Sequence, residues 1–241
     1  MILPGLLNNT EDYDPMATLL RNKYGHSVTT IKVARTDWLR NAVGVVTPEY
    51  WTGTLKPLPT VAWYLDRIDE ALDTDAQEEG VVLIAHSAGG WLGRLWMDAY
   101  SGHTKVHTYI SLGSPQLAAP EGSDAFDQTR GILTYINRKL PGAFHDNVQY
   151  VTVSGSWKKG AGRLQAGNFS DFFVGLTYKQ TCGESEVDGD GITPVPIAHL
   201  EGSEKVNLAA CYHSPVGADE GGGVREWYGS EKMLEQWEHY I

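Results

Sequence analysis

The sequence predicts an α/β protein, with an open sheet of about six mostly parallel strands between two layers of helices. Short runs rich in β-branched residues, such as 81–85 and 106–112, predict strands that are buried on both faces. Amphipathic segments between them, such as 60–72, predict helices. Strands that alternate with helices pair in parallel through right-handed crossovers. With 241 residues, the chain is long enough to fold as one such domain over 1–241.

The expected elements follow one another along the chain with short breaks. Strands are expected at about 1–4, 28–34, 81–85, 106–112, 148–154 and 204–210. Helices are expected at about 12–24, 60–72, 89–100, 129–140 and 231–241. Two segments, 36–59 and 155–187, are long for connections and contain many turn residues. We expect both to be loop excursions near the carboxyl ends of the strands, where open α/β sheets bind ligands.

Both excursions carry aromatic side chains that favour contact with an apolar ligand. Trp38, Tyr50 and Trp51 lie in the first excursion, and Phe173 follows in the second. Ligand cavities are lined largely by apolar and aromatic side chains, so these four are the expected substrate-binding residues. For the first excursion the alternative is a satellite hydrophobic cluster that packs against the edge of the domain itself.

Composition excludes several classes of partner and leaves a small-molecule substrate as the expected one. The net charge of −11 argues against nucleic acid and against an anionic membrane surface. No apolar run approaches the roughly 20 residues of a membrane span, so no integral membrane segment is expected. The N-terminus lacks a signal-peptide pattern, which predicts a cytoplasmic protein, or a stromal one after removal of a transit peptide. Cys182 and Cys211 are expected as free thiols, with one bridge between them as the alternative.

One strand-to-helix junction carries the strongest chemical signal. Residues 81–92 read VVLIAHSAGGWL, in which Ser87 follows a buried strand and precedes a helix that opens with Gly89 and Gly90. This arrangement is typical of a nucleophile elbow, where small neighbours allow a tight turn that exposes the serine hydroxyl. Ala85 stands where the G-x-S-x-G pattern has its first glycine. The alternative is an ordinary junction whose serine only caps the helix.

A serine nucleophile needs a histidine base, and topology selects His213 among the eight histidines. In hydrolases with an elbow of this type, the chain order is serine, acid, histidine. His213 directly follows the last expected strand, at its carboxyl end, where it can reach Ser87. His199 precedes that strand and is the second choice.

The base needs an orienting carboxylate from the segment before the last strand. Asp188 and Asp190 both qualify, and Asp190 is preferred because it begins a tight DGITP turn. The other aspartate would then cap a turn or bind an ion. The spacing does not match an EF-hand loop, so no metal and no cofactor are expected.

Acyl transfer also requires two backbone N–H groups that stabilise an oxyanion. Ala88, the residue after the serine, is the expected first donor. The loop after the first strand, Pro4-Gly5-Leu6, is placed to supply the second donor from Leu6.

These motifs resemble those of the α/β-hydrolase superfamily. The run AHSAGG at 85–90 is similar to the A-H-S-x-G elbow of small bacterial lipases, and residues 189–194 resemble their acid turn. Pro4 stands where the oxyanion loop of these lipases has a histidine. Residues 37–40 and 212–215 also resemble an uncharacterised hydrolase group from cyanobacteria and plants.

The resemblance implies the three-layer α/β-hydrolase fold and a compact serine esterase or lipase that cleaves carboxylic esters through an acyl-enzyme. The aromatic content predicts that the ester substrate has an apolar part. Two other functions use the same residues. The chain could transfer the acyl group to an alcohol other than water, or it could be a binding or receptor protein on the hydrolase scaffold.

Overall fold

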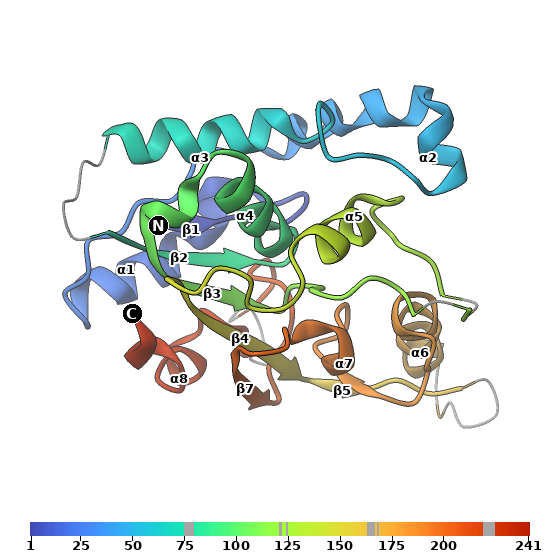
Figure 1. Cartoon of the computed structure of the whole chain (residues 1–241). Helices are drawn as coiled ribbons and strands as arrows, with labels where there is room; N and C mark the ends of the chain where they lie inside the picture. Colours follow the sequence, from blue (N-terminus) through green and yellow to red (C-terminus); the bar gives the residue numbers. More distant parts are fainter. Residues whose placement is uncertain (75–79, 121, 124, 163–166, 168, 219–224) are drawn as a thin grey trace.

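A parallel sheet forms the centre of the computed structural model (Figure 1). The structure describes all residues except 75–79, 121, 124, 163–166, 168 and 219–224. Among the described residues the sheet has five strands in the order β1-β2-β3-β4-β7, and all neighbours pair in parallel. These strands are β1 (Ile2–Leu3), β2 (Val81–His86), β3 (Val106–Leu112), β4 (Gln149–Ser156) and β7 (Glu204–Ala209). Because all five run the same way, their carboxyl ends meet at one edge.

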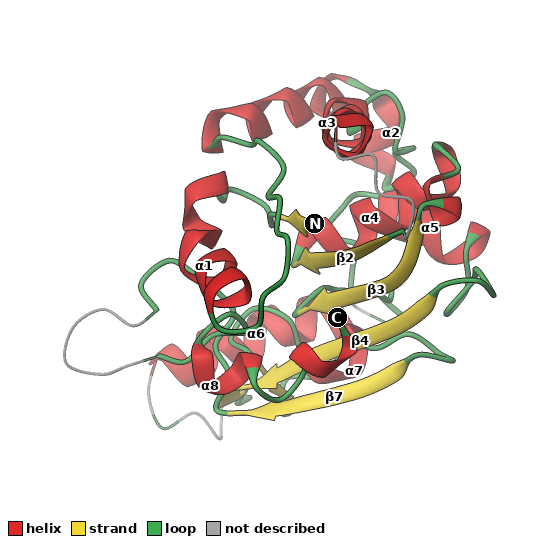
Figure 2. Cartoon of the chain, turned by 90° about the vertical axis from the view of Figure 1, so that its left-hand side faces the viewer, coloured by secondary structure: helices red, strands yellow, loops and turns green. Residues whose placement is uncertain are grey.

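Helices cover both faces of the sheet, which confirms the predicted α/β fold (Figure 2). The helices are α1 (Asp14–Asn22), α2 (Pro48–Thr52), α3 (Ala62–Thr74), α4 (Ala88–Ala99), α5 (Ile132–Lys139), α6 (Phe169–Cys182), α7 (Val195–Ala198) and α8 (Glu231–Leu234). Side chains of α3, α4 and α5 form one hydrophobic core with one face of the sheet, and those of α1 and α8 form another with the opposite face. In β3, Tyr109 belongs to the first core and its neighbour Ile110 to the second, as the alternation of a strand requires.

The expected strand at 28–34 is not formed, which is why the sheet has five strands instead of six. The segment touches β1 at an isolated bridge between Ile2 and Thr30. Strand β1 has only two residues, so a neighbouring segment can pair with it over a very short length. Beyond the bridge, the backbone N–H and carbonyl of Val33 bond to Thr10 instead of to a strand. The alternation of apolar residues correctly indicates which side chains are buried, since Ile31 and Val33 both are. The backbone hydrogen bonds of the segment, however, are those of a loop.

The two expected excursions are more regular than loops. Residues Arg35–Val46 form a 3-10 helix, and α2 follows directly. The second segment contains α6 and a small antiparallel pair, β5 (Lys158–Lys159) with β6 (Asp188–Gly189). The spacing of Phe169, Phe172, Phe173 and Leu176 does predict a helical stretch where α6 lies, whereas glycines, threonines and prolines obscure the short helices of the first segment. The expected closing helix is divided into α8 and a 3-10 turn at Glu238–Tyr240.

Cys182 and Cys211 are free thiols in the structure. Within the described part of the chain, no helix combines the length and apolar character needed to cross a membrane.

Helix α4 packs unusually close to the sheet, and two glycines allow this. A Cβ on Gly89 would lie 2.5 Å from the carbonyl oxygen of Leu3 in β1. A Cβ on Gly90 would overlap the Ser114 hydroxyl in the segment after β3. The helix then buries Leu92, Leu95 and Trp96, spaced along one face. The start of α4 is therefore packed tightly against β1 and against the segment that follows β3.

We expect Gly89→Ala to destabilise the fold by about 1–2 kcal/mol, although alanine favours helices. The obstacle is a backbone carbonyl, which cannot move aside as a flexible side chain could. Urea unfolding followed by circular dichroism measures the change. Gly167→Ala is the control, because the described residue nearest to a Cβ there, Asp171, has its closest atom at 3.7 Å. Equal stability of the two variants would contradict the close packing of α4.

Candidate active site

Ser87 occupies a strained turn between β2 and α4, at the carboxyl edge of the sheet. Its φ of 51° and ψ of −122° lie in a region that residues with a side chain rarely adopt. The turn is held because the Ser87 N–H donates to the Leu112 carbonyl at 2.9 Å and the Gly90 N–H donates to the Ser87 carbonyl at 3.0 Å. No side-chain cap bond from Ser87 to the helix forms. Helix capping therefore does not account for this serine.

The structure brings His213 beside Ser87, as the topology of the sequence predicts. His213 lies in the loop after β7, and its Nε2 is 3.0 Å from Ser87 Oγ. Its Nδ1 is 2.7 Å from Asp190 Oδ2. A carboxylate only accepts hydrogen bonds, so Nδ1 carries the proton and Nε2 is left to accept the Ser87 hydroxyl. This is the tautomer that a general base requires.

Asp190 is fully buried, and four donors hold its carboxylate. Oδ1 accepts the backbone N–H groups of Ile192 at 3.0 Å and Thr193 at 2.7 Å. Oδ2 accepts His213 Nδ1–H and, at 2.7 Å, the hydroxyl of Tyr228. Burial, and next the nearby Asp190 charge, raise the pKa of Tyr228 well above its usual value, so the phenol keeps its proton and donates.

The two alternatives left open by the sequence lie elsewhere. Asp188 is exposed on β6, where it lies opposite Lys159 in the antiparallel pairing of β5 and β6. His199 sits in a polar cluster on β4 and β7, with Nδ1 2.8 Å from Thr152 Oγ1 and Nε2 3.0 Å from Asn207 Oδ1. Burial lowers the pKa of His199.

The loop after β1 lies directly over the Ser87 turn. A Cβ on Gly5 would be 2.8 Å from the Ser87 Cβ, so only glycine allows this approach. Two tyrosine hydroxyls hold the loop: Tyr64 donates to the Pro4 carbonyl at 2.7 Å, and Tyr13 accepts the Gly5 N–H at 2.8 Å. As a result, Leu6 and Ala88 lie with Ser87 on the wall of one cavity.

That cavity has a volume of about 170 Å³ and opens beside the Ser87 hydroxyl. Its wall is mainly apolar, with contributions from α4, the segment 115–133, α6 and α7. The lining residues are Leu6, Ser87, Ala88, Trp91, Pro115, Leu117, Ala119, Phe126, Asp127, Gln128, Thr129, Leu133, Thr181, Ile192, Thr193 and Ile197. A cavity of this kind suits a hydrocarbon group next to a reactive carbonyl.

The four aromatic residues expected to bind substrate are not among the described residues that line this cavity. Trp38 is 4% exposed and packs against Trp63 and Tyr64 in the main core of the domain, so it lies neither on the cavity wall nor in a separate satellite cluster. Tyr50 and Trp51 lie on α2, where the Arg130 guanidinium covers the Tyr50 ring.

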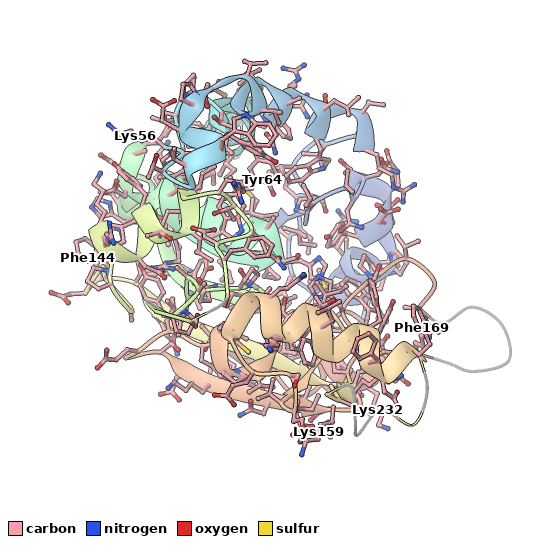
Figure 3. The ribbon with its side chains drawn as sticks, turned by 90° about the vertical axis from the view of Figure 1, so that its right-hand side faces the viewer. Lys56, Tyr64, Phe144, Lys159, Phe169 and Lys232 are labelled. Atoms are coloured by element: carbon pink, nitrogen blue, oxygen red, sulfur yellow. The ribbon has the colours of Figure 1, made fainter. Side chains whose placement is uncertain are left out.

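Phe173 points to solvent on α6, stacked with Phe169, which Figure 3 labels at the end of that helix. The aromatic residues that do line the cavity are Trp91 and Phe126. The position of Trp91 four residues after Ser87, one helical turn on, is a signal that the sequence offered. Tyr228 had no comparable signal.

Across the described residues, no group of three histidine, cysteine, aspartate or glutamate side chains is arranged to hold a metal ion. Asp190 has its oxygens engaged by the four donors. The arrangement at Ser87 is suited to proton transfer and nucleophilic attack.

Comparisons with known proteins place the chain in a family. Residues 11–161 match the family described as PGAP1-like alpha/beta domain; this region includes Ser87 but ends before Asp190 and His213. No curated protein matches the chain.

Among solved structures, the mature form of the lipase BlEst2 from Bacillus licheniformis is similar, with a TM-score of 0.53 and 17% identity over 88% of this chain and 83% of that one. The propeptide form of the same lipase gives a TM-score of 0.56 and 14% identity over 97% of this chain and 48% of that one. At such identities the likeness concerns the fold. Because the family match covers more than half of the sequence, the chain belongs to the PGAP1-like alpha/beta domain family of the α/β-hydrolase superfamily.

Proposed function

We propose that the chain is a serine hydrolase that cleaves carboxylic esters through a triad of Ser87, His213 and Asp190. The observation that carries the proposal is the continuous hydrogen-bond chain from Ser87 Oγ through both ring nitrogens of His213 to a buried carboxylate. The family and the fold are compatible with this chemistry, but do not by themselves define it.

In the first half of the proposed reaction, Ser87 Oγ attacks the ester carbonyl carbon. The hydroxyl proton passes to His213 Nε2, and the carbonyl electron pair moves to oxygen. The backbone N–H groups of Leu6 and Ala88 then stabilise this oxyanion. When the tetrahedral intermediate collapses, the bond to the alkoxy oxygen breaks and that oxygen takes the proton from His213. The products of this half are an alcohol and an acyl-Ser87 ester.

In the second half, water repeats the attack on the acyl-Ser87 ester. His213 Nε2 takes the proton of the water and returns it to Ser87 Oγ, which releases the carboxylic acid. Asp190 keeps the His213 ring in one tautomer and stabilises the imidazolium that forms in each half. The apolar cavity beside Ser87 receives the hydrocarbon part of the substrate.

We expect Ser87→Ala to lower kcat by at least about 10³-fold, because the nucleophile is lost. Hydrolysis of p-nitrophenyl esters with acyl chains of increasing length measures the change. A fluorophosphonate probe should label the wild-type protein and leave the variant unlabelled. Substantial turnover by Ser87→Ala would refute the triad, and failure of the wild type to react with the probe would favour a binding protein.

Asp190→Asn should lower kcat by about 10²–10⁴-fold, because an amide that donates to His213 holds the wrong tautomer. Asp188→Asn is the matched control and should stay near wild type, since Asp188 is exposed on β6. Steady-state kinetics on one ester compares the two variants. A large loss in Asp188→Asn with normal rates in Asp190→Asn would reverse the assignment of the acid.

Trp91→Leu should shift the preferred substrate towards longer acyl chains, because it enlarges the cavity beside Ser87. Each further methylene that becomes buried is worth about fourfold in kcat/KM, from about 0.8 kcal/mol per CH₂. The same ester series measures the shift. Trp51→Leu, at a tryptophan that is 68% exposed on α2, is the control with an unchanged profile. If Trp51→Leu shifted the profile and Trp91→Leu did not, the site would lie against α2 instead.

A further inference from the structure

A second buried hydrogen-bond chain lies behind the candidate triad and uses none of its side chains. His86, the residue before Ser87, has Nε2 2.9 Å from the backbone carbonyl oxygen of His213. Its Nδ1 is 2.7 Å from the Tyr13 hydroxyl. That hydroxyl in turn lies 2.8 Å from the backbone nitrogen of Gly5. His86 is 1% exposed and Tyr13 fully buried, so water does not compete for these bonds.

The direction of each bond follows from the groups at the two ends. The His213 carbonyl only accepts, so His86 Nε2 carries the proton and Nδ1 presents a lone pair. Burial, with a further contribution from His213, lowers the pKa of His86 well below its usual value, so the ring is neutral and has a single N–H. The Tyr13 hydroxyl therefore donates to His86 Nδ1 and accepts the Gly5 N–H.

Among the residues that the structure describes, the Tyr13 hydroxyl has one other acceptor within reach, the Asn8 side-chain oxygen at 3.2 Å. Donation to Asn8 would leave His86 Nδ1 buried without a donor, which is unfavourable. The shorter distance to His86 agrees with donation to the imidazole. All three bonds then run in one sense, from the Gly5 N–H to the His213 carbonyl.

We propose that Tyr13 and His86 are positioning residues that tie the oxyanion loop at 4–6 to the loop that carries His213, so that both keep their places around Ser87. The inference rests on the proposed hydrolase function. The nucleophile, the base and the Leu6 donor come from three segments, and the chain Gly5–Tyr13–His86–His213 joins all three. A displacement of about 1 Å between reacting groups can lower a rate about 10²-fold, so such a tie has a catalytic effect without touching the substrate.

The primary test is Tyr13→Phe, which removes one hydroxyl and keeps the ring that packs on His86 and Trp227. We expect kcat per fluorophosphonate-reactive serine to fall about 10-fold, with KM within about twofold and the acid limb of the pH profile unmoved. Counting reactive serines removes any effect of a smaller folded fraction. Tyr24→Phe, which removes a buried hydroxyl outside this network, is the control at the wild-type rate.

Double variants separate a connected chain from independent local contacts. Tyr13→Phe and His86→Gln break the same chain, so together they should lose about as much as the worse single variant. Tyr64→Phe also removes a hydrogen bond to the oxyanion loop, the one to the Pro4 carbonyl, but Tyr64 is not part of the chain through His86. In the double variant Tyr64→Phe with His86→Gln, the fold-decreases in kcat of the two single variants should therefore multiply.

Wild-type kcat in Tyr13→Phe would overturn the proposal, as would multiplying losses for Tyr13→Phe with His86→Gln. If His86→Gln does not fold, Tyr13→Phe alone decides the matter by its kcat and KM. These outcomes differ from failure of the proposed function itself, in which Ser87→Ala would retain turnover and no serine would react with the probe.

Discussion

The close approach of three backbone segments around Ser87 is the constraint on which the rest of the structure depends. The loop after β1, the Ser87 turn and the segment after β3 are in contact only because Gly5, Gly89 and Gly90 have no side chains. The strained φ and ψ of Ser87 carry an energy of order 1–3 kcal/mol, which surrounding contacts must offset. Those contacts are the buried face of α4 and the bonds that tie β2 to β3. The sheet and helix α4 thus together hold this one unfavourable turn.

Asp190 imposes a second constraint, because a buried carboxylate is stable only when its oxygens are fully paired. Its donors come from its own turn, from the His213 loop and from Tyr228 near the C-terminus. The C-terminal segment therefore contributes to the site without facing the cavity. In the proposed reaction the same carboxylate faces a cation on His213, and its four donors hold it in place while that charge appears and disappears.

Much of the fold and the placement of Ser87, Asp190 and His213 could be predicted, because parallel strands bring their carboxyl ends to one edge whatever lies between them. The loop conformation of residues 28–34 could not be predicted. The alternation of apolar residues indicates only which side chains are buried, whereas a strand also needs a partner strand long enough to pair with. Trp38 could not either. A tryptophan in a long connection packs inward or outward according to neighbours such as Trp63, which no local pattern reports. The bond from Tyr228 to Asp190 joins residues far apart in sequence and has no local signature.

The chemistry and the selectivity of the site come from different parts of the chain. In the proposed reaction, proton transfer involves the Ser87 turn, the Asp190 turn and the His213 loop, and Tyr13 and His86 lie behind them in the buried hydrogen-bond chain. The cavity wall comes mainly from α4 and the segment 115–133, and neither Tyr13 nor His86 lines it. Side chains of the wall can change in size without altering a hydrogen bond of the triad, whereas a change behind Ser87 alters the geometry for every substrate. In the proposed reaction, residues of the wall such as Trp91 and Leu133 would therefore determine which ester fits, and the buried network would determine how fast any ester reacts.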